Sequence, residues 1–189
     1  MAGIASLMKR AVVDVDNTIW DLQAPLRKML RSFYPDIPKV IPPEWNWYQR
    51  YMTDKAFYTA VDAIHQLQIN YLPLPGANEL FITLNLYHYE IFIASHRRNG
   101  AAPALARWLE KHGLEPYSGI YTGPDKRFLI RAGDLVIDDS PDTIRYAHAE
   151  GADVVYLNWP WNDGCPGRGS VSLFGVIDEV NRMRNHETI

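Results

Sequence analysis

The sequence predicts an α/β fold, in which a largely parallel, Rossmann-like sheet is sandwiched by helices. Short and continuous apolar runs are typical of parallel strands that are covered on both faces. Such runs occur at residues 11–15, 91–95, 119–122, 135–138 and 153–157. Helical patterns alternate with these runs, as the connections of a parallel sheet require.

The expected helices are bounded by residues that begin or end helices. Pro103 stands near the start of one helical stretch and Gly113 follows its end, while Gly151 closes another. The expected helices cover residues 76–89, 103–112, 141–150 and 172–184. Each follows a predicted strand or a turn, so the order of elements fits strand–helix units.

Residues 22–75 interrupt this alternation. They are punctuated by prolines, are rich in aromatic side chains and contain a helical run at residues 55–67. The stretch is too long for a plain loop and too apolar for a disordered linker. We therefore expect a catalytic core formed by residues 1–21 and 76–189, and a small helical insertion formed by residues 22–75.

The bulk composition is that of an ordinary globular chain, with 189 residues, 47% hydrophobic and 22% charged. The net charge of −3 shows no basic surplus, so long nucleic acid is not an expected partner. The single cysteine, Cys165, cannot form an internal disulfide. No apolar run approaches the ~20 residues of a membrane helix. We expect a soluble, cytoplasmic protein without a membrane partner.

Carboxylates gather where the predicted strands end. Asp14 and Asp16 end the first strand, Ser95 ends the second, and Asp138 and Asp139 end the fourth. Ligands of parallel sheets bind beyond these ends. A single aspartate there more often caps a helix or forms a turn, but two such clusters are hard to explain in that way. Clustered carboxylates repel one another, and Mg²⁺ is the cation that suits few oxygen ligands completed by water and phosphate.

Four segments, in order along the chain, resemble the motifs of the haloacid dehalogenase (HAD) superfamily. The matching residues are Asp14-Val-Asp16-Asn-Thr18 for the motif D-x-D-x-T, Ser95 for the second motif, Lys126 for the third and Asp138-Asp139 for the fourth. The resemblance extends from residue 11 to about residue 143, and the final strand–helix unit fits it as well.

This resemblance implies a Mg²⁺-dependent phosphomonoester hydrolase that forms an aspartyl-phosphate. Asp14 would be the nucleophile, and Asp16 the general acid and then the general base. Mg²⁺ would bind the Asp14 carboxylate, the backbone carbonyl of Asp16 and Asp138. The phosphate-binding residues would be Ser95, His96 and Lys126, with Asp139 and Thr18 in supporting positions.

The helical insertion lies between the first and second motifs, where the superfamily places a C1-type cap, and it is similar to the cap of 5′(3′)-deoxyribonucleotidases. The chain departs from that group, which often has D-x-D-G-V at the first motif and Thr-Ser-Pro at the second. Here the corresponding residues are Asp16-Asn17-Thr18 and Ser95-His96-Arg97. We expect a small phosphorylated substrate, a nucleoside monophosphate in the first instance.

Aromatic side chains of the insertion can stack on a nucleobase, although each one taken singly is better explained as part of the insertion's own core. The candidates for substrate contact are Trp45, Trp47, Tyr48, Phe57 and, from the core, Arg97. Trp159 and Trp161 follow the last predicted strand and are expected on the same rim. The alternatives are a phosphatase of a sugar phosphate, a phosphoprotein or a nucleic-acid end, and a non-catalytic phosphate-binding protein. A homodimer is left open.

Overall fold

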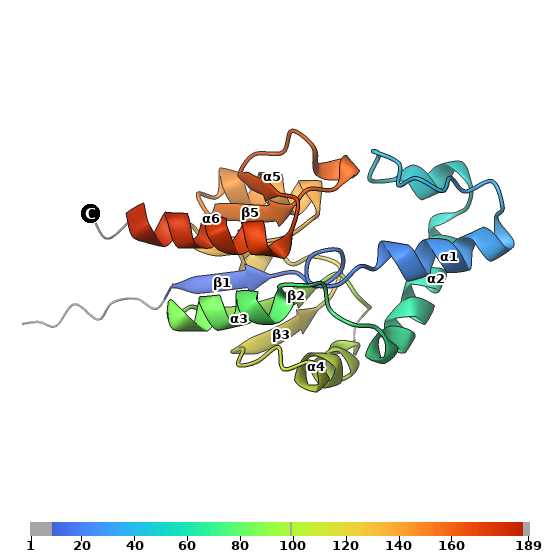
Figure 1. The fold of residues 1–189 in the computed structure, drawn as a ribbon. Coiled ribbons are helices and arrows are strands. Elements are labelled where there is room, and N and C mark those ends of the chain that lie inside the picture. Colours follow the sequence, from blue (N-terminus) through green and yellow to red (C-terminus); the bar gives the residue numbers. More distant parts are fainter. Residues whose placement is uncertain (1–8, 99, 187–189) are drawn as a thin grey trace, which may run out of the picture.

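The computed structural model describes residues 9–98 and 100–186, and its centre is a six-stranded parallel sheet (Figure 1). The expected α/β fold is thus confirmed, while residues 1–8 of the expected core lie outside the described residues. The strands are β1 (Arg10–Val13), β2 (Glu90–Ser95), β3 (Gly119–Thr122), β4 (Leu135–Ile137), β5 (Asp153–Leu157) and β6 (Arg168–Ser170).

The strand order across the sheet is β3-β2-β1-β4-β5-β6, and each neighbouring pair is parallel. From β1 the chain first builds outward through β2 and β3, and it then returns to place β4 on the other side of β1. The switch point of the topology therefore lies between the carboxyl ends of β1 and β4. In open α/β sheets this is the position where ligands bind.

Helices cover the sheet on both faces. They are α3 (Ala77–Leu86), α4 (Ala102–Lys111), α5 (Pro141–Ala149) and α6 (Leu173–His186), with the short 3₁₀ helices η3 (Arg127–Leu129) and η4 (Pro160–Asn162) in the connections. Within β1, Ala11 and Val13 pack into one buried cluster, whereas Val12 packs into a second cluster together with Ile144 of α5. Successive side chains of a strand point to opposite faces. Because both faces are covered, the strands appear in the sequence as continuous apolar runs.

The helical insertion comprises α1 (Gln23–Phe33), η1 (Trp47–Arg50), α2 (Asp54–Leu67) and η2 (Gln68–Asn70). Helix α1 packs against α2, and the Thr53 side chain caps α2 by accepting a hydrogen bond from the Ala56 backbone N–H. Figure 1 shows these helices beyond the carboxyl end of β1, to the right of the sheet. They therefore stand over the switch point. The division of the chain at residues 22 and 75 stays a prediction.

Two elements differ from the expectation. The first strand ends at Val13 rather than at residue 15, because the Val15 carbonyl accepts hydrogen bonds from the backbone N–H groups of Thr18, Ile19 and Trp20 in a tight turn. Strand β6 was not expected at all. It has three residues, contains Gly169 and lies at the sheet edge beside β5, so no apolar run marks it in the sequence.

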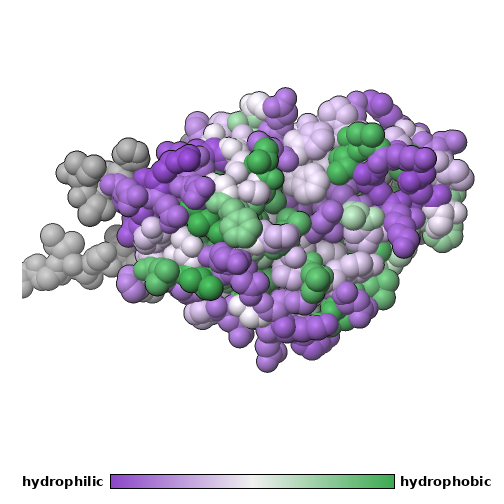
Figure 2. Space-filling model, in the orientation of Figure 1, coloured by the Kyte–Doolittle hydropathy of each residue, from purple (hydrophilic) through white to green (hydrophobic). Residues whose placement is uncertain are grey.

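Among the described residues, no helix combines the length and the apolar character that a membrane crossing needs. On the face shown in Figure 2, hydrophobic residues stand in small groups among hydrophilic ones. The cytoplasmic location and the homodimer stay predictions.

Candidate active site

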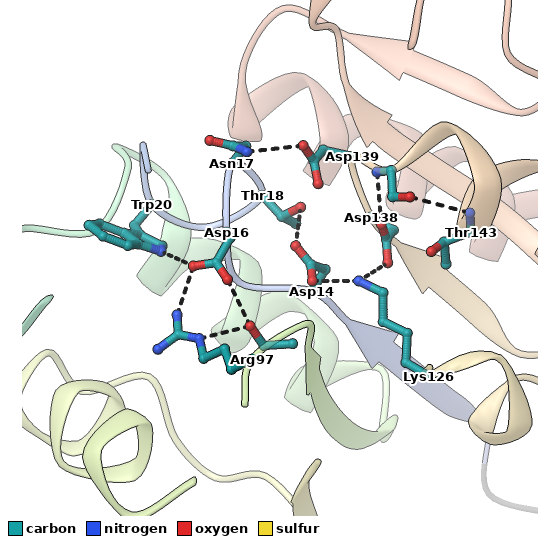
Figure 3. A network of polar contacts seen from close by, with 12 residues as sticks. Asp14, Asp16, Asn17, Thr18, Trp20, Arg97, Lys126, Asp138, Asp139 and Thr143 are labelled. Atoms are coloured by element: carbon teal, nitrogen blue, oxygen red, sulfur yellow. Dashed lines mark hydrogen bonds and ion pairs between the residues drawn. The ribbon is translucent and has the colours of Figure 1, made fainter. Parts of the chain in front are cut away.

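The turn after β1 places Asp14 at the switch point. The Asp14 backbone N–H donates to the Ile137 carbonyl at 2.8 Å, so the ladder between β1 and β4 extends to this residue. Because Val13 pairs with Ile137, Asp14 and Asp138 follow directly after paired residues. The two carboxylates consequently lie side by side, as Figure 3 shows.

The turn itself is held by residues on both sides. Asn17 adopts a left-handed conformation with φ 60, which Asn tolerates better than most residues. The Asn17 carbonyl accepts a hydrogen bond from the Trp159 indole N–H at 2.7 Å, and the Thr18 hydroxyl lies 3.1 Å from Asp14 Oδ2. The supporting position expected for Thr18 is thus next to the Asp14 carboxylate.

Lys126 joins the first and fourth motifs. It is buried just before η3, and its Nζ lies 2.6 Å from Asp14 Oδ1 and 2.6 Å from Asp138 Oδ2. The other Asp138 oxygen accepts the Ser140 backbone N–H at 2.9 Å. Asp139 Oδ2 accepts a hydrogen bond from the Asn17 side chain at 3.2 Å. The first, third and fourth motifs therefore meet in one buried cluster.

The charges of this cluster do not balance. Three buried carboxylates face one lysine, and burial raises the pKa of Asp14 to about 7 although Lys126 opposes the shift. Burial, with the charges of Asp14 and Asp138, raises the pKa of Asp139 well above its usual range. Burial disfavours the charged form of Lys126, but Asp138 and Asp14 outweigh it and raise the lysine pKa. The cluster has more negative charge than its own cation neutralises.

The donor set fits a hard divalent cation. One oxygen each from Asp14, Asp138 and Asp139 lie within 4.8 Å of one another, and few carboxylate ligands completed by water are what Mg²⁺ prefers. Asp139, expected only as a supporting residue, thus belongs to the group that can hold the ion. The expected contribution of the Asp16 backbone carbonyl stays a prediction.

Asp16 lies in a separate, well-connected environment. Its Oδ1 accepts hydrogen bonds from the Trp20 indole at 2.8 Å and from Arg97 Nη2 at 2.8 Å, and His65 Nε2 lies 3.1 Å away. Its Oδ2 accepts the Ser95 hydroxyl at 2.9 Å. Burial alone favours protonation of Asp16, but Arg97 and His65 outweigh it and hold the Asp16 pKa well below its usual range.

The residues of the second motif are divided between this network and the cavity. Ser95 is fully buried, and besides donating to Asp16 its Oγ accepts Arg97 Nε–H at 2.9 Å. Arg97 is buried as well, whereas His96 is exposed and lines the cavity described below. Partial desolvation at the cavity wall, together with the charge of Lys126, lowers the His96 pKa. The expected phosphate contacts of Ser95 and His96, and the substrate contact of Arg97, stay predictions.

A cavity of about 330 Å³ extends from Asp14, Asp16 and Lys126 to the helical insertion. Much of its wall is aromatic and comes from both parts of the chain. The aromatic lining residues are Trp45, Trp47, Tyr48, Phe57, Tyr58 and Trp161. All four insertion aromatics named from the sequence therefore line the cavity that contains the acidic residues.

These aromatic residues do not have equal freedom. Tyr48 and Phe57 stack on each other with centroids 3.7 Å apart, and Trp47 is buried against both. Trp45 and Tyr58 are 44% and 46% exposed. The first three form the insertion's own core with one side at the cavity, whereas the last two have ring surface available.

Sequence reasoning missed three residues around Asp16, namely Trp20, His65 and Gln68. Gln68 is buried, and its Oε1 accepts Arg97 Nη1 at 2.6 Å. His65 had a detectable signal, because it lies four positions after Val61 on the buried face of the expected helix. Its contact with Asp16 joins residues 49 positions apart, and no local pattern predicts such a pair.

Comparison with known proteins gives matches by structure. A scan against protein-family models finds no match, and a search of curated proteins finds none. Among solved structures, the HAD-hydrolase YfnB from Bacillus subtilis, bound to magnesium, is similar with a TM-score of 0.60 and 19% identity, over 92% of this chain and 99% of that chain.

Two further neighbours are a haloacid dehalogenase-like hydrolase and a sugar phosphatase. The haloacid dehalogenase-like hydrolase SP0104 from Streptococcus pneumoniae has a TM-score of 0.63 and 15% identity, over 92% of this chain and 98% of that chain. The D,D-heptose 1.7-bisphosphate phosphatase from B. bronchiseptica, complexed with magnesium and phosphate, has a TM-score of 0.52 and 15% identity, over 93% and 99%. At these low sequence identities, the similarity establishes a HAD-like fold. It does not establish the reaction, because one fold can host several chemistries.

Proposed function

We propose that this chain, which has the fold of HAD-superfamily hydrolases, is a Mg²⁺-dependent phosphomonoesterase with Asp14 as its nucleophile. The observation that carries the proposal is the cluster at the switch point, where Lys126 bridges Asp14 and Asp138 at 2.6 Å each. Asp16 lies two residues further along the same turn and also lines the cavity. A nucleophile, a cation partner and a second carboxylate thus surround one space.

In this proposal an oxygen of Asp14 attacks the phosphorus atom, and the bond from phosphorus to the leaving oxygen breaks. Asp16 gives a proton to that oxygen, so the alcohol leaves uncharged. A water then attacks the aspartyl-phosphate and gives a proton back to Asp16, which restores the free Asp14 carboxylate. Because Asp16 is ionised in the free site, it takes up this proton from solvent as the substrate enters, when the negative charge of the phosphate raises the proton affinity of the carboxylate.

Mg²⁺ would be held by Asp14 and Asp138, with Asp139 beside them, and when bound it would supply the charge that offsets repulsion between nucleophile and phosphate. Lys126 orients the Asp14 carboxylate and provides a point charge toward phosphate oxygens. Phosphoryl transfer depends mainly on such positioning and charge stabilisation, which is what this cluster offers. We also propose that the helical insertion, residues 22–75, serves as a cap over the site.

For the substrate we propose a nucleoside monophosphate. The exposed rings of Trp45 and Tyr58 offer stacking surface within the cavity, and the His96 ring is nearly parallel to Tyr58, at 11° and 6.2 Å between centroids. Stacking of a base on an aromatic side chain is worth about 1–3 kcal/mol. Among the described residues, Lys126 and Arg127 are the only lysine and arginine in the wall of this cavity. Both are paired, Lys126 with Asp14 and Arg127 with Asp125. This favours one phosphate group over two.

A panel of phosphate esters tests the chemistry and the substrate together. With Mg²⁺ we expect phosphate release from nucleoside monophosphates faster than from sugar phosphates, and we expect EDTA to abolish it. Asp14→Asn should lower turnover by about 10³-fold or more, whereas the exposed control Asp36→Asn should not. Intact turnover in Asp14→Asn would refute the nucleophile. Turnover without preference for nucleotides would refute the substrate and leave the chemistry standing.

The aromatic contact has its own test. Tyr58→Ala and Trp45→Ala should each raise the KM for a nucleoside monophosphate by about 5- to 100-fold, the equivalent of a stacking contact, with little change for glycerol 3-phosphate. Phe33→Ala is a matched control, because Phe33 is an exposed aromatic residue of the insertion outside the cavity wall. Equal changes for both substrates would show that the rings do not recognise a base.

A further inference from the structure

Arg97 is a buried cation whose three nitrogens each reach a different partner. Nη2 donates to Asp16 Oδ1 at 2.8 Å, Nε donates to Ser95 Oγ at 2.9 Å, and Nη1 donates to Gln68 Oε1 at 2.6 Å. Its side chain is 2% exposed. Arg97 does not line the cavity, so its guanidinium is turned toward protein groups rather than toward the space for substrate.

The hydrogen bonds divide the two oxygens of Asp16 into different roles. Oδ1 has three partners, Trp20, Arg97 and His65, and its lone pairs are fully used. Oδ2 has one partner, the Ser95 hydroxyl. A carboxylate oxygen with one partner can still accept a proton, so Oδ2 is the atom able to exchange a proton with substrate or water.

Arg97 holds both oxygens of Asp16 in these roles, Oδ1 directly and Oδ2 through Ser95. It contacts Oδ1 directly, and through Nε it occupies a lone pair of Ser95 Oγ, which orients the serine hydroxyl toward Oδ2 (Figure 3 shows Asp16 and Arg97). Unlike His65, whose donor role depends on its tautomer, Arg97 stays charged over the whole working pH range. Arg97 reaches its three acceptors from three separate nitrogens, whereas the three N–H donors of a lysine ammonium all start from a single nitrogen.

Arg97 also ties Asp16 to the helical insertion. Gln68, in η2 at the end of α2, is 2% exposed, and its Oε1 is bonded to Arg97. His65 of α2 approaches the same Asp16 oxygen. The second motif and the C-terminal end of α2 therefore meet at one guanidinium and one carboxylate.

We propose that Arg97 is a positioning residue that holds Asp16 with Oδ2 directed to the reaction, and that Gln68 anchors it from the insertion. The proposal rests on the phosphatase function proposed above. It assigns Arg97 to the proton-transfer step rather than to phosphate or base recognition. Substitution of Arg97 should therefore lower the rate most for esters whose leaving group must be protonated.

Two phosphate esters differ in how far their leaving groups depend on protonation by an acid. p-Nitrophenyl phosphate releases a stable phenolate and needs little help from an acid, whereas β-glycerol phosphate releases a poor alkoxide and depends on one. Arg97→Lys keeps the charge but loses the fork. We expect it to lower kcat for β-glycerol phosphate at least about tenfold more than kcat for p-nitrophenyl phosphate, since a well-placed acid contributes about 10²- to 10⁴-fold. Equal loss on both esters would overturn the proposal.

Gln68→Met removes the anchor without changing Arg97, and it keeps the proposal testable if Arg97→Lys does not fold. It should shift the ratio of the two kcat values in the same direction, and an unchanged ratio would contradict the anchoring role. Arg98→Met is the matched control. Arg98 is exposed and pairs with Asp62 of α2 at 3.4 Å, so this variant removes a surface pair between the same two parts of the chain, and both kcat values should stay within about twofold.

A double-mutant cycle decides whether Arg97 acts through Asp16. Asp16→Asn alone should already lower the kcat ratio of β-glycerol phosphate to p-nitrophenyl phosphate. In that background Arg97→Lys should change the ratio by less than about twofold, and a further loss as large as in the wild type would overturn the proposal. A wild-type protein that hydrolyses neither ester with Mg²⁺ would refute the phosphatase function and the role of Arg97 with it.

Discussion

At the scale of single residues, the balance of charge around Asp14 governs the candidate site. Its carboxylate shares Lys126 with Asp138, and Asp139 is close to both. Each buried carboxylate beyond the first raises the free energy of the ionised cluster. A site built for a divalent cation has this property, because the ion supplies the missing positive charge.

The pKa of Asp14 leads to a prediction for the metal-free protein. The carboxyl pKa of Asp14 is about 7 in the folded protein, against an ordinary aspartate value of 3.8. A raised folded pKa stabilises the fold below pH 3.8, and that stabilisation is lost as the pH rises through 7. In EDTA, Asp14→Asn should therefore gain stability relative to wild type between pH 5 and pH 8, on the order of a few kcal/mol. Urea unfolding at both pH values measures this, and a difference that does not change with pH would contradict it.

Lys126 gives a second prediction. Lys126→Met leaves Asp14 and Asp138 buried without their cation, and we expect a loss of about 3–5 kcal/mol in the free energy of unfolding at pH 8 in EDTA. Added Mg²⁺ should recover part of this loss. Lys111→Met serves as the control, because Lys111 is exposed and donates to one carbonyl only. Equal losses for the two variants would show that the buried pairs of Lys126 contribute nothing special.

Much of the site at this scale was predictable from the sequence. Asp14, Asp138 and Asp139 follow apolar strand runs, and parallel strands bring their carboxyl ends to one edge. The buried environment of Asp16 was not predictable. Its partners His65 and Arg97 lie 49 and 81 positions away, and they meet only when the insertion packs on the core.

At the scale of elements, the connection after β5 braces the turns that follow β1 and β4. The Asn162 side chain is fully buried, and it donates to the carbonyls of Asp139 and Leu157 while accepting the Trp159 backbone N–H. The Trp161 indole donates to the same Asp139 carbonyl at 3.2 Å. The segment therefore links the fourth motif to the first through Trp159.

Asn162→Ala tests this brace. It removes the Asn162 hydrogen bonds to the Leu157 carbonyl and the Trp159 N–H, while the Asp139 carbonyl keeps the Trp161 indole. An unsatisfied buried group costs about 1–3 kcal/mol. We expect a loss of at least about 2 kcal/mol in the free energy of unfolding, with weaker Mg²⁺ binding. Asn78→Ala is the control, since Asn78 is exposed and its side chain donates one hydrogen bond, to the His112 carbonyl. A loss no larger than that of the control would argue against the brace.

Helices and strands with a clear pattern of apolar residues were predictable from the sequence, and elements without such a pattern were not. Strands β2 to β5 and helices α3 to α6 lie within a few residues of their expected positions, because their periodic apolar residues are buried on defined faces. Strand β6 escaped prediction, because a short edge strand is defined by backbone pairing rather than by side chains. The turn after Val13 escaped as well, because Val15 is apolar and buried although it lies outside the strand.

At the scale of the whole molecule, the fold encloses a cavity between two parts of the chain. The sheet supplies the acidic cluster at its switch point, and the insertion supplies most of the aromatic wall. Contacts such as Trp45 with Trp161, at 5.8 Å between centroids, join the two parts near the cavity. In the proposed function, reaction chemistry and substrate choice then belong to different segments.

Metal binding should then be linked to the stability of the whole protein. A ligand that binds the folded state raises Tm, and Mg²⁺ must displace the proton of Asp14, whose pKa is about 7. The rise in Tm with Mg²⁺ should be larger at pH 8 than at pH 6, and it should be strongly reduced in Asp14→Asn. Equal rises at both pH values in both proteins would place the ion elsewhere.

The most direct test of the account is the covalent intermediate on Asp14. After a brief reaction with a nucleoside monophosphate and Mg²⁺, acid quench and pepsin digestion in acid, mass spectrometry of the peptide that contains Asp14 should show one added phosphate on this residue. The label should be absent with EDTA and in Asp14→Asn. Phosphate release without a label on this peptide, or with a label on another residue, would contradict the assignment of Asp14 as nucleophile.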